Sequence, residues 1–387
     1  MSGPEIITLP PAPSTLRDDI LKGLTKDPNN RTLPTMLLYD ETGLRLYDDI
    51  TTQVHEYYLF PAEESILKEK SDEIVLAMCG TQRAEGESVL ELGAGCVLML
   101  LEDFRNLSPI RRSLRKTSHL LKALARATPA KAAPITYFAL DLEHKELVRT
   151  LTPLASSTNI GAELAGKVAV KGICGRYEEG FKLVRAGGLP RPTGHQEQKE
   201  RVPSSFPRSG SPSNSLSPTS EASTLSSPSG TPSTVASSLP SPRTDALDLE
   251  VSGPPLHFLF LGSSIGNFTR QGAAEFLRAL PLRPTSGTEP GDTLLIGIDH
   301  KNDKDIIELA YNDPREISQR FMLNGLTVAN RTLSSGGEKV FKDETWGFHG
   351  VYNEQEGEAF LPISVLYNSN YVKAAMKVTT NLRSTRK

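Results

Sequence analysis

The sequence predicts an α/β protein built on a doubly wound, mostly parallel sheet. Two observations support this class: short runs of β-branched and apolar residues alternate with helical patterns, and most of these runs end at glycine or aspartate. Helices cover both faces of a parallel sheet, so its strands are continuous apolar runs. In such folds the ligand binds beyond the carboxyl ends of the strands. The glycines and aspartates therefore mark a ligand-binding edge.

Five segments match the pattern of a buried strand. In chain order they are ESVLELGAG, PITYFALD, KVAVKGICG, LHFLFLGSS and DTLLIGID, which begin at residues 87, 134, 167, 256 and 292. Helical patterns are expected between them, over residues 113–127 and 271–280.

A long segment between the third and fourth strands has a different composition. Residues 196–242 are dominated by Ser, Pro and Thr, which offer too little apolar surface to offset the entropy lost on ordering. We therefore predict disorder there. The predicted domains are an N-terminal helical segment (1–60), a discontinuous sheet core (61–184 and 254–300), a disordered insertion (185–253) and a C-terminal lobe (301–387).

Charge and cysteine usage exclude several classes of partner. The 43 basic and 46 acidic residues give a net charge of −3, so nothing indicates nucleic acid or an anionic membrane. The cysteines, Cys79, Cys96 and Cys174, are too far apart to form a metal or redox motif, and the seven histidines show no ligand spacing. With neither a signal peptide nor a long apolar run, the chain is expected to be a cytoplasmic monomer that binds a small molecule.

The ends of the first two predicted strands show a pattern that is typical of proteins that bind nucleoside cofactors. Gly93 and Gly95 follow the first strand and allow backbone to approach a ligand where a β-carbon would collide. Asp141 closes the second strand, where an acidic residue accepts ribose hydroxyls. A tight turn without a ligand would contain the same glycines. The pattern fits NAD and S-adenosylmethionine (SAM) equally.

Five motifs, taken together, resemble one enzyme family. They are LYDETGLRLYDDIT from residue 38, HEYYLFPAEESIL from residue 55, ELGAG from residue 91, SLRKTSHLL from residue 113 and LFLGSSIGNF from residue 259. They are similar to the histidine N-alpha-methyltransferases of ergothioneine biosynthesis, and to a fungal relative, the dimethylallyltryptophan N-methyltransferase of ergot alkaloid synthesis. The resemblance runs from about residue 15 to residue 356 outside the Ser/Pro segment, and it implies a class I SAM-dependent methyltransferase fold.

The resemblance implies which residues hold the cofactor. Gly93, Lys116 and Asp141 are expected to bind SAM, and Tyr177 to flank the adenine. The residue before this aromatic is often acidic in the family but is Arg176 here, so only a contact independent of that side chain is expected.

The family positions around the amino-acid substrate correspond to Tyr39, Tyr57, Asn267 and Tyr311. Asn267 offers both an amide donor and a carbonyl acceptor to an amine or carboxylate. It would equally serve to cap the helix that begins near Thr269.

The expected reaction is an in-line methyl transfer to a neutral α-amino nitrogen, which requires alignment and exclusion of water, with no dedicated catalytic base and no metal. Histidine is the expected acceptor. Dimethylallyltryptophan is the alternative, favoured by an apolar pocket, and a non-catalytic relative is the alternative from another class.

Two departures from the family pattern support the non-catalytic alternative. A segment of 17 residues, from Cys96 to Arg112, separates the Gly-x-Gly turn from the helix that carries Lys116. The sequence after residue 357 is expected to lose the resemblance and contains no Glu-x-Ser pair. Weak SAM binding and little turnover are therefore predicted.

Overall fold

A computed structural model describes residues 3–11, 14–27, 31–81, 86–94, 115–156, 160–189, 253–285, 291–334, 338–342, 346–355, 357–360, 363–365 and 380–381. Contacts group residues 1–194 and 253–387 into one compact unit, to which the whole description below belongs. The expected insertion from Cys96 to Arg112 and the Ser/Pro stretch 196–242 lie outside the described residues.

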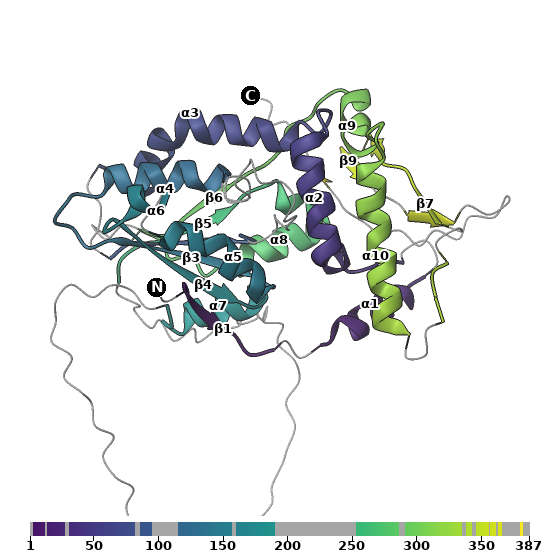
Figure 1. The fold of residues 1–387 in the computed structure, drawn as a ribbon, viewed down its shortest axis with the longest axis horizontal. Helices are drawn as coiled ribbons and strands as arrows, with labels where there is room; N and C mark the ends of the chain where they lie inside the picture. Colours follow the sequence, from purple (N-terminus) through teal and green to yellow (C-terminus); the bar gives the residue numbers. More distant parts are fainter. Residues whose placement is uncertain are drawn as a thin grey trace, which may run out of the picture. The chain divides into compact units, whose positions relative to one another are not determined.

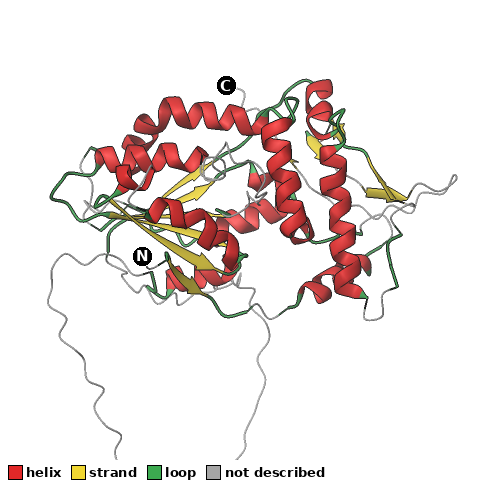
Figure 2. Cartoon of the chain, viewed as in Figure 1, coloured by secondary structure: helices red, strands yellow, loops and turns green. Residues whose placement is uncertain are grey.

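The unit is built around a six-stranded sheet in the order β1-β4-β3-β2-β5-β6, with every neighbouring pair parallel (Figures 1 and 2). Five strands confirm the sequence predictions: β2 (Ser88–Leu92), β3 (Ile135–Asp141), β4 (Val168–Cys174), β5 (Leu256–Phe260) and β6 (Thr293–Ile296). This arrangement confirms the doubly wound α/β class.

Strand β1 (Glu5–Thr8) was not predicted. It pairs with β4 at the edge of the sheet, so the N-terminal segment 1–60 contributes a core strand and is not helical throughout. The helices of this segment are α1 (Leu16–Leu24), the 3-10 helix η2 (Thr35–Leu38) and α2 (Glu41–Gln53).

Helices cover both faces of the sheet. Every residue of β2, β3 and β5 is therefore buried. On one face Val89, Tyr137 and Leu259 pack with α3 (Leu59–Cys79), α4 (Arg115–Ala127), α5 (His144–Ala155) and α6 (Ile160–Leu164). On the other, Leu90 and Phe258 pack with α7 (Tyr177–Arg185) and α8 (Arg270–Ala279). Helices α4 and α8 match the two helices expected from the sequence.

A lobe forms from both ends of the chain. Helix α10 (Ile317–Leu333) packs with η2 and α2 around a core that includes Leu37, Ile50 and Phe321. Asp40 joins the two parts by accepting a hydrogen bond from Asn324 at 2.6 Å and pairing with Arg331. The remaining elements are α9 (Lys304–Tyr311), β7 (Trp346–Phe348), β8 (Val351–Asn353), β9 (Glu358–Phe360), β10 (Ile363–Val365) and β11 (Thr380–Asn381).

Within the described part of the chain, no helix combines the length and the apolar character needed to cross a membrane.

Candidate active site

A cavity of about 640 Å³ opens at the carboxyl edge of the sheet and extends to the lobe. Its volume is typical of small-molecule sites, which occupy roughly 300–1,000 Å³. Seven of the eight residues expected from the sequence line it: Tyr39, Tyr57, Gly93, Asp141, Tyr177, Asn267 and Tyr311. The eighth, Lys116, is absent from the described lining.

The turn after β2 brings backbone to the cavity wall. Gly93 has a φ of +78°, in the left-handed region that favours glycine. A β-carbon at this position would lie 2.7 Å from the hydroxyl oxygen of Tyr177. The Gly93 N–H donates to the carbonyl oxygen of Leu140 at 2.9 Å, which ties the turn to β3. A side chain at position 93 would therefore have a strained backbone and would collide with Tyr177.

Asp141 ends β3 with its side chain at the cavity, and only 9% of the residue is exposed. One carboxylate oxygen, Oδ1, accepts hydrogen bonds from the N–H groups of Leu142 at 2.7 Å and Glu143 at 3.3 Å. These bonds hold the carboxylate at the strand end, which is the position of a ribose acceptor in nucleoside-binding sheets.

Tyr177 opens α7 and packs edge-on against Phe260 and Phe276, with ring centroids 6.0 and 5.7 Å apart. Its neighbour Arg176 is directed to the N-terminal segment, where its guanidinium pairs with Asp19 at 3.3 Å. The departure from the family pattern at Arg176 is therefore used to hold α1.

Lys116 makes an ion pair with Glu63 at 2.5 Å and lies 4.1 Å from the centroid of the Phe60 ring. Both oxygens of Glu63 also accept the Gly262 N–H, at 2.9 and 3.0 Å. Gly262 lines the cavity after β5, so Glu63 links Lys116 to the cavity wall.

The start of α4 has a second acidic anchor. Thr117 donates to Glu91 at 2.8 Å, and the Tyr137 hydroxyl also donates to this carboxylate. Burial raises the pKa of Glu91, and the two hydrogen bonds oppose that rise. The pair Glu63 and Glu91 thus fixes the first turn of α4 against α3 and β2.

The loop after β5 carries Asn267. Ser263 has a φ of +52°, which is uncommon for a residue other than glycine and marks a locally strained backbone. The chain then forms the 3-10 helix η4 (Ser264–Asn267). Helix α8 is capped by Thr269, whose hydroxyl accepts the Gly272 N–H at 3.0 Å. Asn267 therefore does not cap α8, and it lines the cavity.

Aromatic side chains dominate the lobe side of the cavity. Tyr57 and Tyr311 meet edge-on at 6.1 Å. Tyr39, Tyr47 and Phe321 form a second group with ring centroids 5.7 to 6.3 Å apart. Offset and edge-on packing is the favourable geometry for such rings. The result is a mainly apolar wall that carries phenol hydroxyls.

The adjacent tyrosines 57 and 58 have different environments. Burial raises the pKa of Tyr57 well above its ordinary value, so its phenol stays protonated at neutral pH. Tyr58 does not line the cavity; its hydroxyl donates to Asp299 at 2.6 Å. Burial raises the pKa values of both Tyr58 and Asp299. Their bond attaches the motif HEYY to the end of β6.

Three participants were missing from the sequence predictions: Glu63, Tyr47 and Phe321. Glu63 occurs in a helix with several other glutamates, so composition does not single it out. Tyr47 and Phe321 are separated by more than 250 residues and fit the ordinary apolar face of a helix. The signal available for Glu63 and Tyr47 was their place inside motifs that resemble the family.

Comparisons with known proteins identify several related methyltransferases. The L-tryptophan methyltransferase trpM of Psilocybe serbica is 33% identical over 88% of this chain and 73% of its own length. Ergothioneine biosynthesis protein 1 of Schizosaccharomyces pombe is 30% identical over 84% of this chain, which spans only 30% of that protein. The histidine N-alpha-methyltransferase of Mycobacterium tuberculosis is 26% identical over 83% of this chain and 66% of its own length.

The profile of a family described as histidine-specific, SAM-dependent methyltransferases matches residues 16–202 and 242–383. The match continues to residue 383, so the expectation that the resemblance ends before residue 358 is wrong. Strands β9 and β10, which pair with β8 and β7, also belong to this matched tail. The family match, the parallel sheet and the cavity at its carboxyl edge agree. This chain belongs to the histidine-specific, SAM-dependent methyltransferase family, whose cofactor is SAM.

Proposed function

We propose that the protein transfers a methyl group from SAM to the α-amino nitrogen of an aromatic amino acid, and that the preferred acceptor is an amino acid with an indole side chain. The observation that carries this proposal is the aromatic wall of Tyr39, Tyr47 and Phe321 on the lobe side of the cavity. Such a wall favours a large, flat, mainly apolar side chain.

Three residues fit the cofactor. The Gly93 backbone offers close approach, the Asp141 carboxylate suits ribose hydroxyls, and the Tyr177 ring at the cavity wall suits the adenine face. SAM, when bound, supplies an electrophilic methyl group on a sulfonium. Lys116 is proposed as a positioning residue, because it acts through Glu63 on the loop at Gly262.

The acceptor must present a neutral nitrogen, although an α-amino group is mostly protonated at neutral pH. Tyr57, Tyr311 and Asn267 surround the proposed position of that group. The raised pKa of Tyr57 means that its hydroxyl orients the amine by hydrogen bonding and does not act as a strong base. Tyrosine faces also stabilise the cationic product. Alignment and exclusion of water then account for the catalysis.

An indole needs fewer polar partners than an imidazole. The indole N–H only donates, whereas a neutral imidazole requires both a donor and an acceptor. Apart from the phenol hydroxyls of the aromatic wall, the described lobe side offers the hydroxyl of Ser318 and the carboxylate of Asp40, and Asp40 is already engaged by Asn324 and Arg331. The tryptophan methyltransferase of P. serbica, similar to this chain over most of both lengths, supports the same acceptor class.

Histidine is the second candidate. The family description and the ergothioneine and histidine methyltransferase relatives favour it.

The test is a methyl-transfer assay with SAM and three acceptors: L-tryptophan, 4-dimethylallyl-L-tryptophan and L-histidine. Products are identified by mass spectrometry. We expect kcat/KM for an indole acceptor at least about tenfold above that for histidine, a difference of about 1.4 kcal/mol. N-acetyl-tryptophan, whose nitrogen is blocked, should give no product.

A higher kcat/KM for histidine would assign the acceptor to the second candidate. Methylation of the indole ring nitrogen would contradict the α-amino assignment. SAM binding by calorimetry without transfer to any acceptor would support the non-catalytic alternative.

A further inference from the structure

Three side chains with metal-ligating atoms meet at the amino ends of the strands, opposite the carboxyl ends that line the cavity. Cys79 ends α3, Glu87 immediately precedes β2, and His257 is the second residue of β5. Their sulfur, carboxylate oxygen and imidazole nitrogen atoms all lie within 4.8 Å of one another. The strands are parallel, so their amino ends, where this cluster lies, are remote from the carboxyl ends that line the cavity.

The distances leave room for one ion between the three atoms. The His257 Nε2 atom is 3.7 Å from the Cys79 sulfur and 3.9 Å from the Glu87 Oε2 atom. With the third side no longer than 4.8 Å, a point equidistant from all three lies within about 2.5 Å of each. This is close to zinc bond lengths of about 2.0–2.3 Å, so small side-chain adjustments complete the coordination.

The chemistry of the three groups favours zinc over harder cations. Thiolate and imidazole ligands select borderline and soft metals, whereas Ca²⁺ and Mg²⁺ require oxygen ligands. Glu87 and His257 are each only 1% exposed, so both would hold the ion away from bulk solvent. Cys79 is partly exposed, which provides a route for the ion from solvent.

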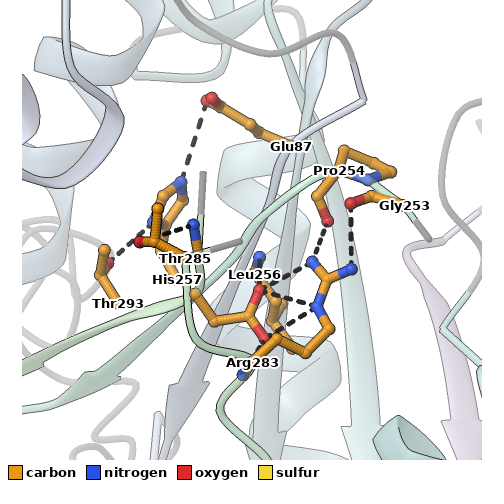
Figure 3. Close-up of polar contacts among 10 residues, drawn as sticks. Glu87, Gly253, Pro254, Leu256, His257, Arg283, Thr285 and Thr293 are labelled. Atoms are coloured by element: carbon orange, nitrogen blue, oxygen red, sulfur yellow. Dashed lines mark hydrogen bonds and ion pairs between the residues drawn. The ribbon is translucent and has the colours of Figure 1, made fainter. Parts of the chain in front are cut away.

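The imidazole is already oriented for coordination. Its Nδ1 atom is 2.8 Å from the Thr293 hydroxyl, which leaves Nε2 directed toward Glu87 (Figure 3). Metal-bound histidines commonly use their second ring nitrogen in this way, and such partners fix the tautomer and the ring plane.

We propose that Cys79, Glu87 and His257 form a zinc-binding site separate from the methyl-transfer cavity. The ion would join the end of α3 to the starts of β2 and β5, with a solvent molecule as the fourth ligand. Its role would be structural. The 8-residue and 170-residue separations of the three ligands explain why the sequence shows no zinc motif.

The experiment uses the full chain, reduced and stripped of metal with a chelator, and titrated with Co²⁺ as a spectroscopic substitute for zinc. We expect one equivalent to bind with a thiolate-to-cobalt charge-transfer band, and zinc to displace it. Because the Cys79 thiol must lose its proton to the solvent when it binds metal, affinity should fall between pH 8 and pH 6.

Matched variants identify the ligands. Cys79→Ser should abolish the thiolate band, whereas Cys174→Ser and Cys96→Ser should retain it. Thr293→Val should weaken affinity about 10- to 100-fold by removing the partner of the imidazole. Circular dichroism checks that each variant is folded, and Glu87→Gln provides a second ligand variant if Cys79→Ser is unstable.

Two results would overturn the proposal. One is the absence of stoichiometric Co²⁺ and Zn²⁺ binding by the folded wild-type chain, which would leave the cluster as a buried polar pair with a neighbouring thiol. The other is a thiolate band of equal intensity in folded Cys79→Ser.

Discussion

At the scale of single residues, Asp141 provides the sharpest test of the cofactor site. Asp141→Ala removes a buried carboxylate at the cavity, and a hydrogen bond to a charged group contributes about 1.5–3 kcal/mol. SAM affinity measured by calorimetry should fall about tenfold or more. Asp303→Ala, which removes the same charge from a position that makes no side-chain cap bond, should leave affinity unchanged. Unchanged affinity in Asp141→Ala would remove Asp141 from the site.

Tyr57 and Tyr58 form a matched pair, since one lines the cavity and the other bonds to Asp299. Tyr57→Phe should lower acceptor kcat/KM about tenfold, because it removes a hydroxyl near the amine while retaining the ring. SAM affinity should not change. Tyr58→Phe should instead lower the free energy of unfolding by about 1 kcal/mol through the lost hydrogen bond. The reverse pattern in kinetics and denaturation would contradict this division.

Glu146 predicts a pH dependence of stability. Burial raises its pKa to about 7 from an ordinary value of 4.5. Between these values the folded chain keeps a proton that the unfolded chain releases, so rising pH destabilises the fold. A difference of one in pKa between the folded and the unfolded chain corresponds to about 1.4 kcal/mol of stability. Glu146→Gln should therefore gain stability relative to the wild type from pH 4.5 to pH 8 in urea denaturation. A difference independent of pH would refute the assignment.

At the scale of elements, Glu63 connects α3, α4 and the loop after β5 through Lys116 and Gly262. Glu63→Ala leaves a lysine with 11% side-chain exposure without its partner, and breaking a buried pair costs about 3–5 kcal/mol. We expect about 3 kcal/mol less stability in denaturant unfolding, together with weaker SAM binding.

The control lies on the same helix. Glu73 pairs with Lys70 on the surface, with 71% and 54% side-chain exposure, so Glu73→Ala should cost less than about 1 kcal/mol. Equal losses in Glu63→Ala and Glu73→Ala would show that the connection at Glu63 is not specific.

The strands were predictable where a short apolar or β-branched run ends at glycine or aspartate, which holds for the partly buried β4 and β6 as well as for β3. Segment 135–141 is buried at every position, and most of its residues are apolar, aromatic or β-branched. Strand β1 was missed because its four residues run into Leu9, Pro10 and Pro11 and not into the glycine or aspartate that follows the other strands. The local sequence pattern predicted Gly93 and Asp141 at the strand ends, but it did not predict the contact between Tyr47 and Phe321 in the lobe wall. Tyr47 and Phe321 meet only through packing of α2 on α10, and no local pattern encodes that contact.

At the scale of the whole molecule, the 17 residues from Cys96 to Arg112 follow the Gly-x-Gly turn directly. The family profile matches across them, although they lie outside the described residues. We expect deletion of residues 96–112 to raise SAM affinity about tenfold or more, because it would place Lys116 four residues after Gly95, the spacing that the motif resemblance implies. Calorimetry should compare it with deletion of residues 211–227, also 17 residues long, which should change nothing. Equal affinity in the wild type and both deletions would show that the segment is harmless.

The lobe is built from segments that lie far apart in the chain, and this imposes an order of events during synthesis. Helix α2 ends at Gln53, and its packing partner α10 begins at Ile317. At about 5–20 residues per second, a ribosome needs roughly 10–50 s to translate the intervening chain. During this time the apolar face of α2 cannot pack against α10. The nascent protein therefore exposes this apolar surface until α10 has been synthesised, and the lobe side of the cavity is completed only then.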